Sequence, residues 1–129
     1  MISEERLLAK ELIEKIVKRT DEGKIPWEVK EKPLFSEDFG TSEHPYVARC
    51  DSMNLSLHGY KRSSSRFLEI SNGKIKTEFY SSDRLYSKTL KTLFKTVDNL
   101  IRKSWEKERA EREKAETKSL INQLARVLD

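Results

Sequence analysis

The spacing of apolar residues predicts an α-helix at the start of the chain. Leu8, Leu12 and Ile16 form one row at intervals of four, and Ile13 with Val17 forms the row beside it. Rows of this kind make up one face of an amphipathic helix, with polar side chains on the other face. We expect this helix to run for about five turns of 3.6 residues and to end near residue 20.

The following segment, residues 21–45, contains all three prolines of the chain and two of its four glycines. This composition predicts an irregular connection. The segment is nevertheless too rich in aliphatic and aromatic residues for a free linker. We therefore expect it to be pinned onto the domain, with Trp27 at the edge of the core. Binding of a peptide by these aromatic residues is the alternative.

From residue 46 the apolar period changes to two, which is typical of strands with one buried face. Residues 46–50, 53–57, 66–70 and 74–80 fit this pattern, and the first two segments form either two strands or one strand bent at Asp51-Ser52. Asn72-Gly73 predicts a tight type I′ hairpin, because that turn needs positive φ at both central positions. The sequence thus predicts an antiparallel β-meander of three or four strands.

The last third of the chain, from Asp83 to Leu128, predicts one long helix, since neither Gly nor Pro occurs after Gly73. Its first half has one apolar face, which we expect to cover the sheet beside the first helix. The residues of that face are Tyr86, Leu90, Leu93, Val97, Leu100 and Ile101. The predicted fold class is therefore α+β, a two-layer sandwich of an N-terminal helix, a β-meander and a long C-terminal helix.

A second apolar face follows the nearly all-polar residues 106–119. It consists of Leu120, Ile121, Leu124, Val127 and Leu128. On an ideal helix this face points about 180° away from the face that covers the sheet. Either the chain breaks within residues 106–119 and folds back, or the second face packs on another chain; the lack of Gly and Pro favours the latter. We accordingly divide the chain into an α+β domain, residues 1–105, and a charged helical extension with an apolar tip, residues 106–129.

Charge is unevenly distributed along the chain. The net charge is +4, but residues 61–104 alone hold 11 Lys and Arg against 4 Asp and Glu, a net +7. An anionic partner would therefore bind the middle of the chain. The candidate residues for binding nucleic acid are Lys61, Arg62 and Arg66 in a loop cluster, and Arg84, Lys88, Lys91, Lys95 and Arg102 along the helix.

Residues with catalytic or metal-binding chemistry are few. Cys50 is the only cysteine, and His44 and His58 stand in no metal-ligand spacing and are expected at the surface. No phosphate-binding glycine loop or nucleophile motif occurs. We expect no enzymatic activity, cofactor, metal or small-molecule substrate. With no signal peptide or membrane span in the sequence, we expect a soluble cytoplasmic protein without a membrane partner.

The order of features resembles that of small proteins from bacteria and their phages. The residues that carry the resemblance are Gly-Lys-Ile-Pro-Trp-Glu at 23–28 and Phe-Leu-Glu-Ile-Ser-Asn-Gly-Lys at 67–74. It covers roughly residues 5–105 and implies a first helix, a three-stranded meander and a final helix; the charged residues 106–119 depart from it. The resemblance implies a mobile-element protein that binds a host factor, and it assigns no functional residues.

These observations predict a non-enzymatic protein-interaction module. Its C-terminal helix would bind a second copy, a dimer being the simplest assembly, or a host or other partner protein, for example as an inhibitor encoded by a phage. The alternative is a nucleic-acid-binding protein that uses the basic residues between positions 61 and 103.

Overall fold

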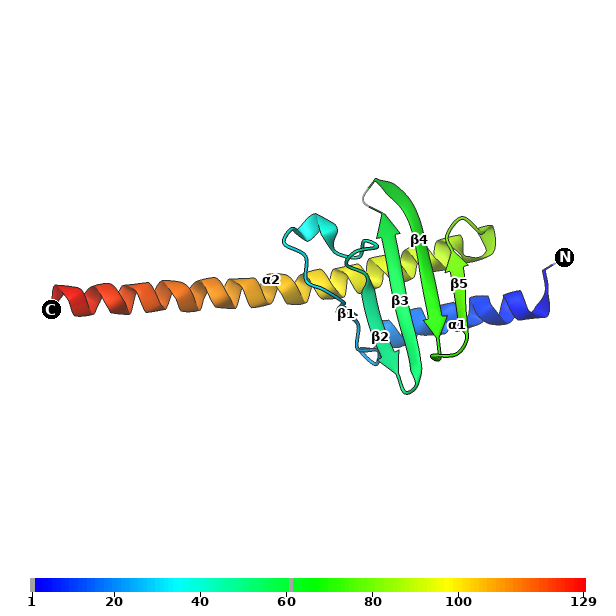
Figure 1. Ribbon diagram of the computed structural model, residues 1–129, viewed down its shortest axis with the longest axis horizontal. Coiled ribbons are helices and arrows are strands. Elements are labelled where there is room, and N and C mark those ends of the chain that lie inside the picture. The colour runs from blue at the N-terminus through cyan, green and yellow to red at the C-terminus, as the bar shows by residue number, and fades with distance from the viewer. Residues whose placement is uncertain (1, 61) are drawn as a thin grey trace.

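The computed structural model describes residues 2–60 and 62–129, and its elements follow the order helix, sheet, helix (Figure 1). They are α1 (Glu4–Asp21), β1 (Glu28–Val29), the 3-10 turn η1 (Ser36–Asp38), β2 (Tyr46–Cys50), β3 (Met53–Tyr60), β4 (Ser63–Ser71), β5 (Lys76–Tyr80) and α2 (Arg84–Leu128). The predicted α+β class is confirmed. The sheet has five strands in the order β1-β2-β3-β4-β5, all neighbours antiparallel, instead of the three or four predicted.

The additional strand, β1, lies within the segment that was predicted to be irregular. Glu28 pairs with Val47 and Val29 pairs with Tyr46. Two residues are too few to show a period in the sequence, and β1 exists because the edge of β2 offers backbone partners. The prediction that Trp27 packs at the edge of the core is confirmed. Its indole Nε1 donates a hydrogen bond to Thr20 Oγ1, 2.9 Å away.

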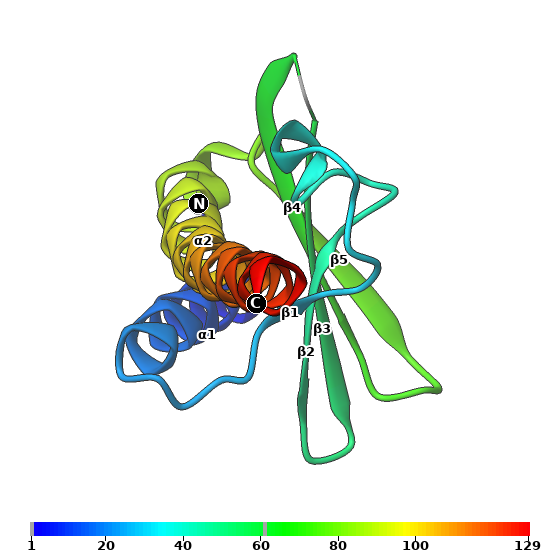
Figure 2. The same ribbon diagram turned by 90° about the vertical axis from the view of Figure 1, so that its left-hand side faces the viewer.

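Both helices lie on the same side of the sheet and run side by side in the same direction (Figure 2). Their first turns are joined by Arg6, whose Nη2 donates to both carboxylate oxygens of Asp83 at 2.8 and 2.6 Å. Asp83 is also the N-cap of α2 and accepts a hydrogen bond from Leu85 N at 3.0 Å. The hydrophobic side chains that are 0% exposed are Ile13, Tyr46, Leu57, Leu68, Leu90, Leu93 and Val97.

The buried face of α1 differs from the expected one. Ile13, Ile16 and Thr20 are buried, whereas Leu8 and Leu12 are exposed. The apolar residues of α1 occupy more than one face of the helix. The row that faces α2 is buried, and the others stay more exposed. Periodicity in α1 alone could not show which row is buried.

The structure also defines the turns at the two predicted positions, Asp51-Ser52 and Asn72-Gly73. Asp51 and Ser52 join two separate strands, and Asp51 adopts a positive φ of 54°. Between β4 and β5 only Gly73 has a positive φ, 91°, while Asn72 Oδ1 accepts hydrogen bonds from the backbone N of residues 74 and 75 at 3.0 and 2.8 Å. The predicted type I′ turn at Asn72-Gly73 is therefore wrong. Local capping by the Asn side chain gives a longer loop instead.

The loop that contains η1 folds over the end of β3 close to α2. Gly59 N donates to Gly40 O at 2.7 Å, and Thr41 forms a parallel bridge with Gly59. Gly40 has a φ of +77°, and a Cβ atom there would come within 2.6 Å of the Tyr46 ring and 2.7 Å of the Phe94 ring. Only glycine fits this position without a shift of the neighbouring rings.

α2 is one unbroken helix of 45 residues, so the chain does not fold back within residues 106–119. Trp105 is the last residue of α2 that packs against the core, and every residue from 106 to 129 is exposed. Lys32 Nζ contacts Glu108 Oε2 at 3.2 Å, and Arg109 Nε contacts Glu113 Oε1 at 3.2 Å. Beyond these contacts the helix extends away from the other elements (Figure 1).

Candidate interaction surfaces

The residues predicted to bind a partner form an exposed distal face on α2. Leu120, Ile121, Leu124, Val127 and Leu128 are each between 58% and 79% exposed. Leu124 follows the fully buried Val97 by 27 residues, which is about 7.5 turns at 3.6 residues per turn. The distal face consequently points away from the side of α2 that packs on the sheet. No other element of the described chain lies against it (Figure 1).

The same arithmetic relates the distal face to the basic residues of α2. Leu124 follows Lys88 by 36 residues, and Val127 follows Lys91 by 36 residues, which is about ten turns in each case. Both sets of side chains therefore lie along one line of the helix surface, about 54 Å apart at 5.4 Å per turn. The two sets were predicted separately from the sequence, without the line that they share.

Four of the eight predicted basic residues come together in the structure. Arg84, Lys88, Lys91 and Lys95 are exposed and line one shallow hollow of about 530 Å³, which we call the basic stripe. Among residues 2–60 and 62–129, none of the four has a carboxylate within ion-pair distance. Their charges are therefore available to an external anion.

The other predicted basic residues do not join the stripe. The Arg66 guanidinium stacks on the Phe94 ring at 4.2 Å and donates to the carbonyl oxygens of residues 63 and 65. Arg102 Nε donates to Asp98 Oδ1 at 2.9 Å. Arg62 is exposed at the turn between β3 and β4, and Lys61 lies outside the described residues.

A partly buried polar network of Tyr46, Asp98 and Arg102 links β2 to α2. The Tyr46 hydroxyl donates a hydrogen bond to Asp98 Oδ1, and Arg102 holds the same carboxylate. Burial raises the pKa of Tyr46, and the neighbouring Asp98 carboxylate raises it further. The Arg102 guanidinium also lies over the Phe39 ring at 5.5 Å, which explains why it is held against the domain.

A small apolar hollow of about 330 Å³ lies beside α2 where the helix leaves the sheet. Trp27, Trp105 and Phe39 line it, and the Phe39 and Trp105 rings meet edge to face with centroids 5.6 Å apart. This hollow could not be predicted from the sequence, because its walls come from three separate segments: residues 25–32, Phe39 and residues 100–108. The aromatic content of residues 21–45 was the available signal.

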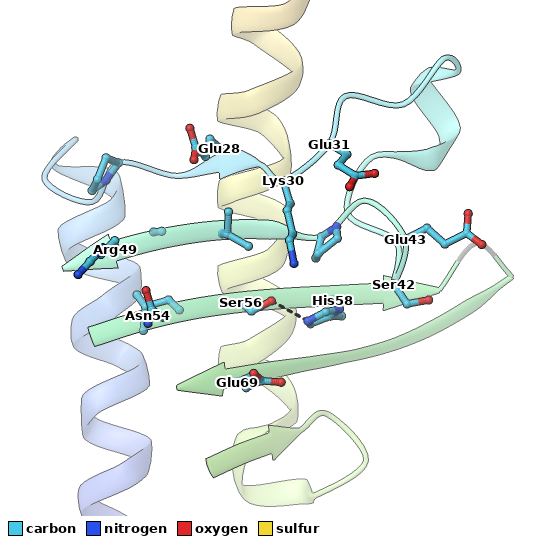
Figure 3. Close-up of a pocket in the computed structure, with 15 residues that line it drawn as sticks. Glu28, Lys30, Glu31, Ser42, Glu43, Arg49, Asn54, Ser56, His58 and Glu69 are labelled. Atoms are coloured by element: carbon cyan, nitrogen blue, oxygen red, sulfur yellow. Dashed lines mark hydrogen bonds between the residues drawn. The ribbon is translucent and has the colours of Figure 1, made fainter. Parts of the chain in front are cut away.

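The helix-free face of the sheet carries a groove of about 760 Å³ (Figure 3). In it Ser56 Oγ and His58 Nε2 share a hydrogen bond of 2.7 Å, and the His58 ring stacks on Phe67 with centroids 4.3 Å apart. The pKa of His58 is lowered, chiefly because burial disfavours the charged imidazole. His58 is thus a half-buried strand residue, and the prediction that it lies at the surface is wrong.

The Ser56–His58 hydrogen bond resembles the contact between a serine nucleophile and its general base. The third group of such a site, which would orient the histidine, is missing among the described residues. His58 Nδ1 is buried and has no hydrogen-bond partner among the described residues. A serine nucleophile normally needs a third group that orients the base at that nitrogen. The described residues also contain no cluster of three His, Cys, Asp or Glu side chains that could hold a metal ion.

In the part of the chain that the structure describes, neither helix has an apolar stretch long enough to cross a membrane. Comparisons with protein families, with curated proteins and with solved structures find no match to this chain. The resemblance to small bacterial and phage proteins therefore stays a prediction, and function has to be argued from the surfaces themselves.

Proposed function

We propose that this protein is a non-enzymatic interaction module that self-associates through the distal face of α2. The proposal rests on the direction of that face, which points away from the side of α2 that packs on the sheet. Five large aliphatic side chains lie exposed on one side of the helix, beyond the last residue that packs on the core. Amphipathic helices without an intramolecular site typically pack on a helix or in a groove of another chain.

The apolar content of the distal face suits a reversible dimer. Full burial of a Leu, Ile or Val side chain contributes about 1.5–3 kcal/mol. Five such side chains per copy would give a gross gain of about 7–15 kcal/mol from each copy. Association itself costs an estimated 4–15 kcal/mol, and incomplete burial reduces the gain. We therefore expect assembly that depends on protein concentration.

Charge favours an antiparallel arrangement of the two helices. The basic stripe lies on the same line as the distal face, so a parallel pair along this line would bring Lys88 and Lys91 of both copies together. Like charges at close range oppose association. An antiparallel pair that overlaps only through residues 117–128 keeps the stripes at opposite ends. It also leaves both stripes uncovered.

Light scattering of the full chain over a range of concentrations tests this proposal. Leu124→Glu should abolish the dimer or weaken it at least tenfold, because it places a charge at the centre of the apolar contact. Asn122→Glu is the matched control, since it adds the same charge on the opposite side of the helix and should leave the dimer intact. A wild-type chain that stays monomeric at every concentration, or a control that dissociates equally, would contradict self-association.

A further inference from the structure

The basic stripe places four cationic side chains on a stretch of helix that has no acidic residue of its own. Residues 84–97 contain one Arg and three Lys and no acidic residue. The acidic residues on either side are already engaged, Asp83 by Arg6 and Asp98 by Tyr46 and Arg102. The stripe therefore presents four unneutralised charges in one row.

We propose that the basic stripe binds the phosphate backbone of a nucleic acid without reading its sequence. From Arg84 to Lys95 the helix rises about 16 Å at 1.5 Å per residue. One strand of duplex DNA places a phosphate every 3.4 Å along the axis, so the row spans about five phosphates. The Ser87 hydroxyl lines the same hollow and can donate to a phosphate oxygen.

The composition of the stripe distinguishes this ligand from an acidic protein. Protein–protein contacts centre on buried aromatic and aliphatic side chains, and their cores are depleted of lysine. The hollow has the opposite composition, because apart from Ser87 and Thr92 its lining is entirely cationic. Lysines act as point charges toward phosphate. None of the described residues that line the hollow is an Asn or Gln that could pair with adenine, and Arg84 is the only guanidinium among them.

Binding of the full chain to a labelled mixed-sequence duplex and to the corresponding single strand tests the proposal through its salt dependence. Between about 50 and 200 mM salt, four phosphate contacts predict a slope of log K against log salt near −3.6 for the duplex and −2.8 for the single strand. The triple variant Lys88→Gln, Lys91→Gln, Lys95→Gln should reduce the duplex slope to near −0.9. The single variants Lys88→Gln and Lys91→Gln should each reduce it by about 0.9, which keeps the test valid if the triple variant folds poorly.

The matched control removes the same three charges from another side of α2. Lys103→Gln, Lys107→Gln, Lys114→Gln lowers the net charge equally and should preserve the slope, since these exposed lysines lie off the stripe. Equal loss in the control and in the stripe variant would show a delocalised net-charge effect and overturn the proposal. Tighter binding of poly-glutamate than of either nucleic acid at the same salt would assign the stripe to an acidic protein instead. Absence of binding at the lowest salt would also overturn it.

Discussion

Tyr46 and Asp98 lie 52 positions apart in the chain and are joined by a hydrogen bond that ties β2 to α2. Because Tyr46 is fully buried and its hydroxyl donates to a carboxylate oxygen, removal of the hydroxyl should be costly. We expect Tyr46→Phe to lower the free energy of unfolding by about 1.5–3 kcal/mol in urea titrations. Tyr80→Phe is the control: it removes a hydroxyl that bonds Glu78 at the exposed surface, so its effect should be close to zero.

The same tyrosine should make the protein sensitive to alkali. Burial raises the pKa of Tyr46 in the folded state, whereas an unfolded tyrosine titrates near pH 10. Above pH 10 the unfolded chain loses this proton first, so stability falls as pH rises; below that pH the contribution is fully present. Unfolding free energies of the wild type and Tyr46→Phe, measured from pH 8 upward, should converge as the pH increases. A constant difference between them would contradict this assignment.

His58 should give a corresponding loss of stability at mildly acidic pH. Its pKa is lowered chiefly by burial and also by Lys30, while Glu69 and Glu78 act in the opposite direction. An unfolded histidine has a pKa of about 6.5, so below that pH the unfolded chain binds the proton more readily. Stability should therefore fall as pH drops through this window. In His58→Phe, which keeps a ring against Phe67, the fall between about pH 7 and pH 5.5 should be smaller.

Gly40 and Gly23 offer a paired test of steric constraint. Both have positive φ, +77° and +71°, but a Cβ atom would meet two aromatic rings at Gly40 and nothing within 4 Å at Gly23. Gly23→Ala should destabilise by about 1–2 kcal/mol from its backbone conformation. Gly40→Ala should cost about 1–3 kcal/mol more through overpacking, measured by thermal unfolding. Equal losses would mean that the loop shifts freely away from Tyr46 and Phe94.

Amide hydrogen exchange in the exposed part of α2 should report whether two copies of the chain associate. A helix without tertiary contacts is only marginally stable, and residues 110–128 make none with the rest of the described chain. Their amides should exchange far faster than those of Leu90 or Val97 in dilute protein. Protection of residues 117–128 should rise with protein concentration in the wild type. In Leu124→Glu it should stay low.

Local periodicity was sufficient to predict the order of the elements other than β1 and η1. The three-to-four spacing of Leu90, Leu93 and Val97 identifies a helix face without knowledge of its neighbours, and alternation does the same for the strands. β1 could not be predicted in this way, since a two-residue strand owes its existence to the edge of β2. The exposure of Leu8 and Leu12 could not be predicted either, because it also depends on a neighbouring element: α1 has several apolar rows, and α2 covers one of them.

The candidate surfaces were predictable only where they lie on a single helix. Helical spacing placed Arg84, Lys88, Lys91 and Lys95 on one face, and the structure gathers them. The same spacing included Arg102, but its guanidinium is held by Asp98 and lies over an aromatic ring that comes from a distant loop. The groove at His58 carried no sequence signal, since its walls combine residues of β1 to β4 with a loop, and the segment that contains β1 was predicted to be irregular.

The length of α2 also determines how the molecule moves through solution. Beyond Trp105 the helix adds 23 residues, or about 35 Å at 1.5 Å per residue, to a small two-layer domain. A rod of that length raises the frictional drag more than the same mass would if it were packed into the domain. A single copy will therefore diffuse slowly and elute early from a sizing column, much as a rounder dimer would. Mass and drag will have to be measured separately to distinguish one elongated chain from two.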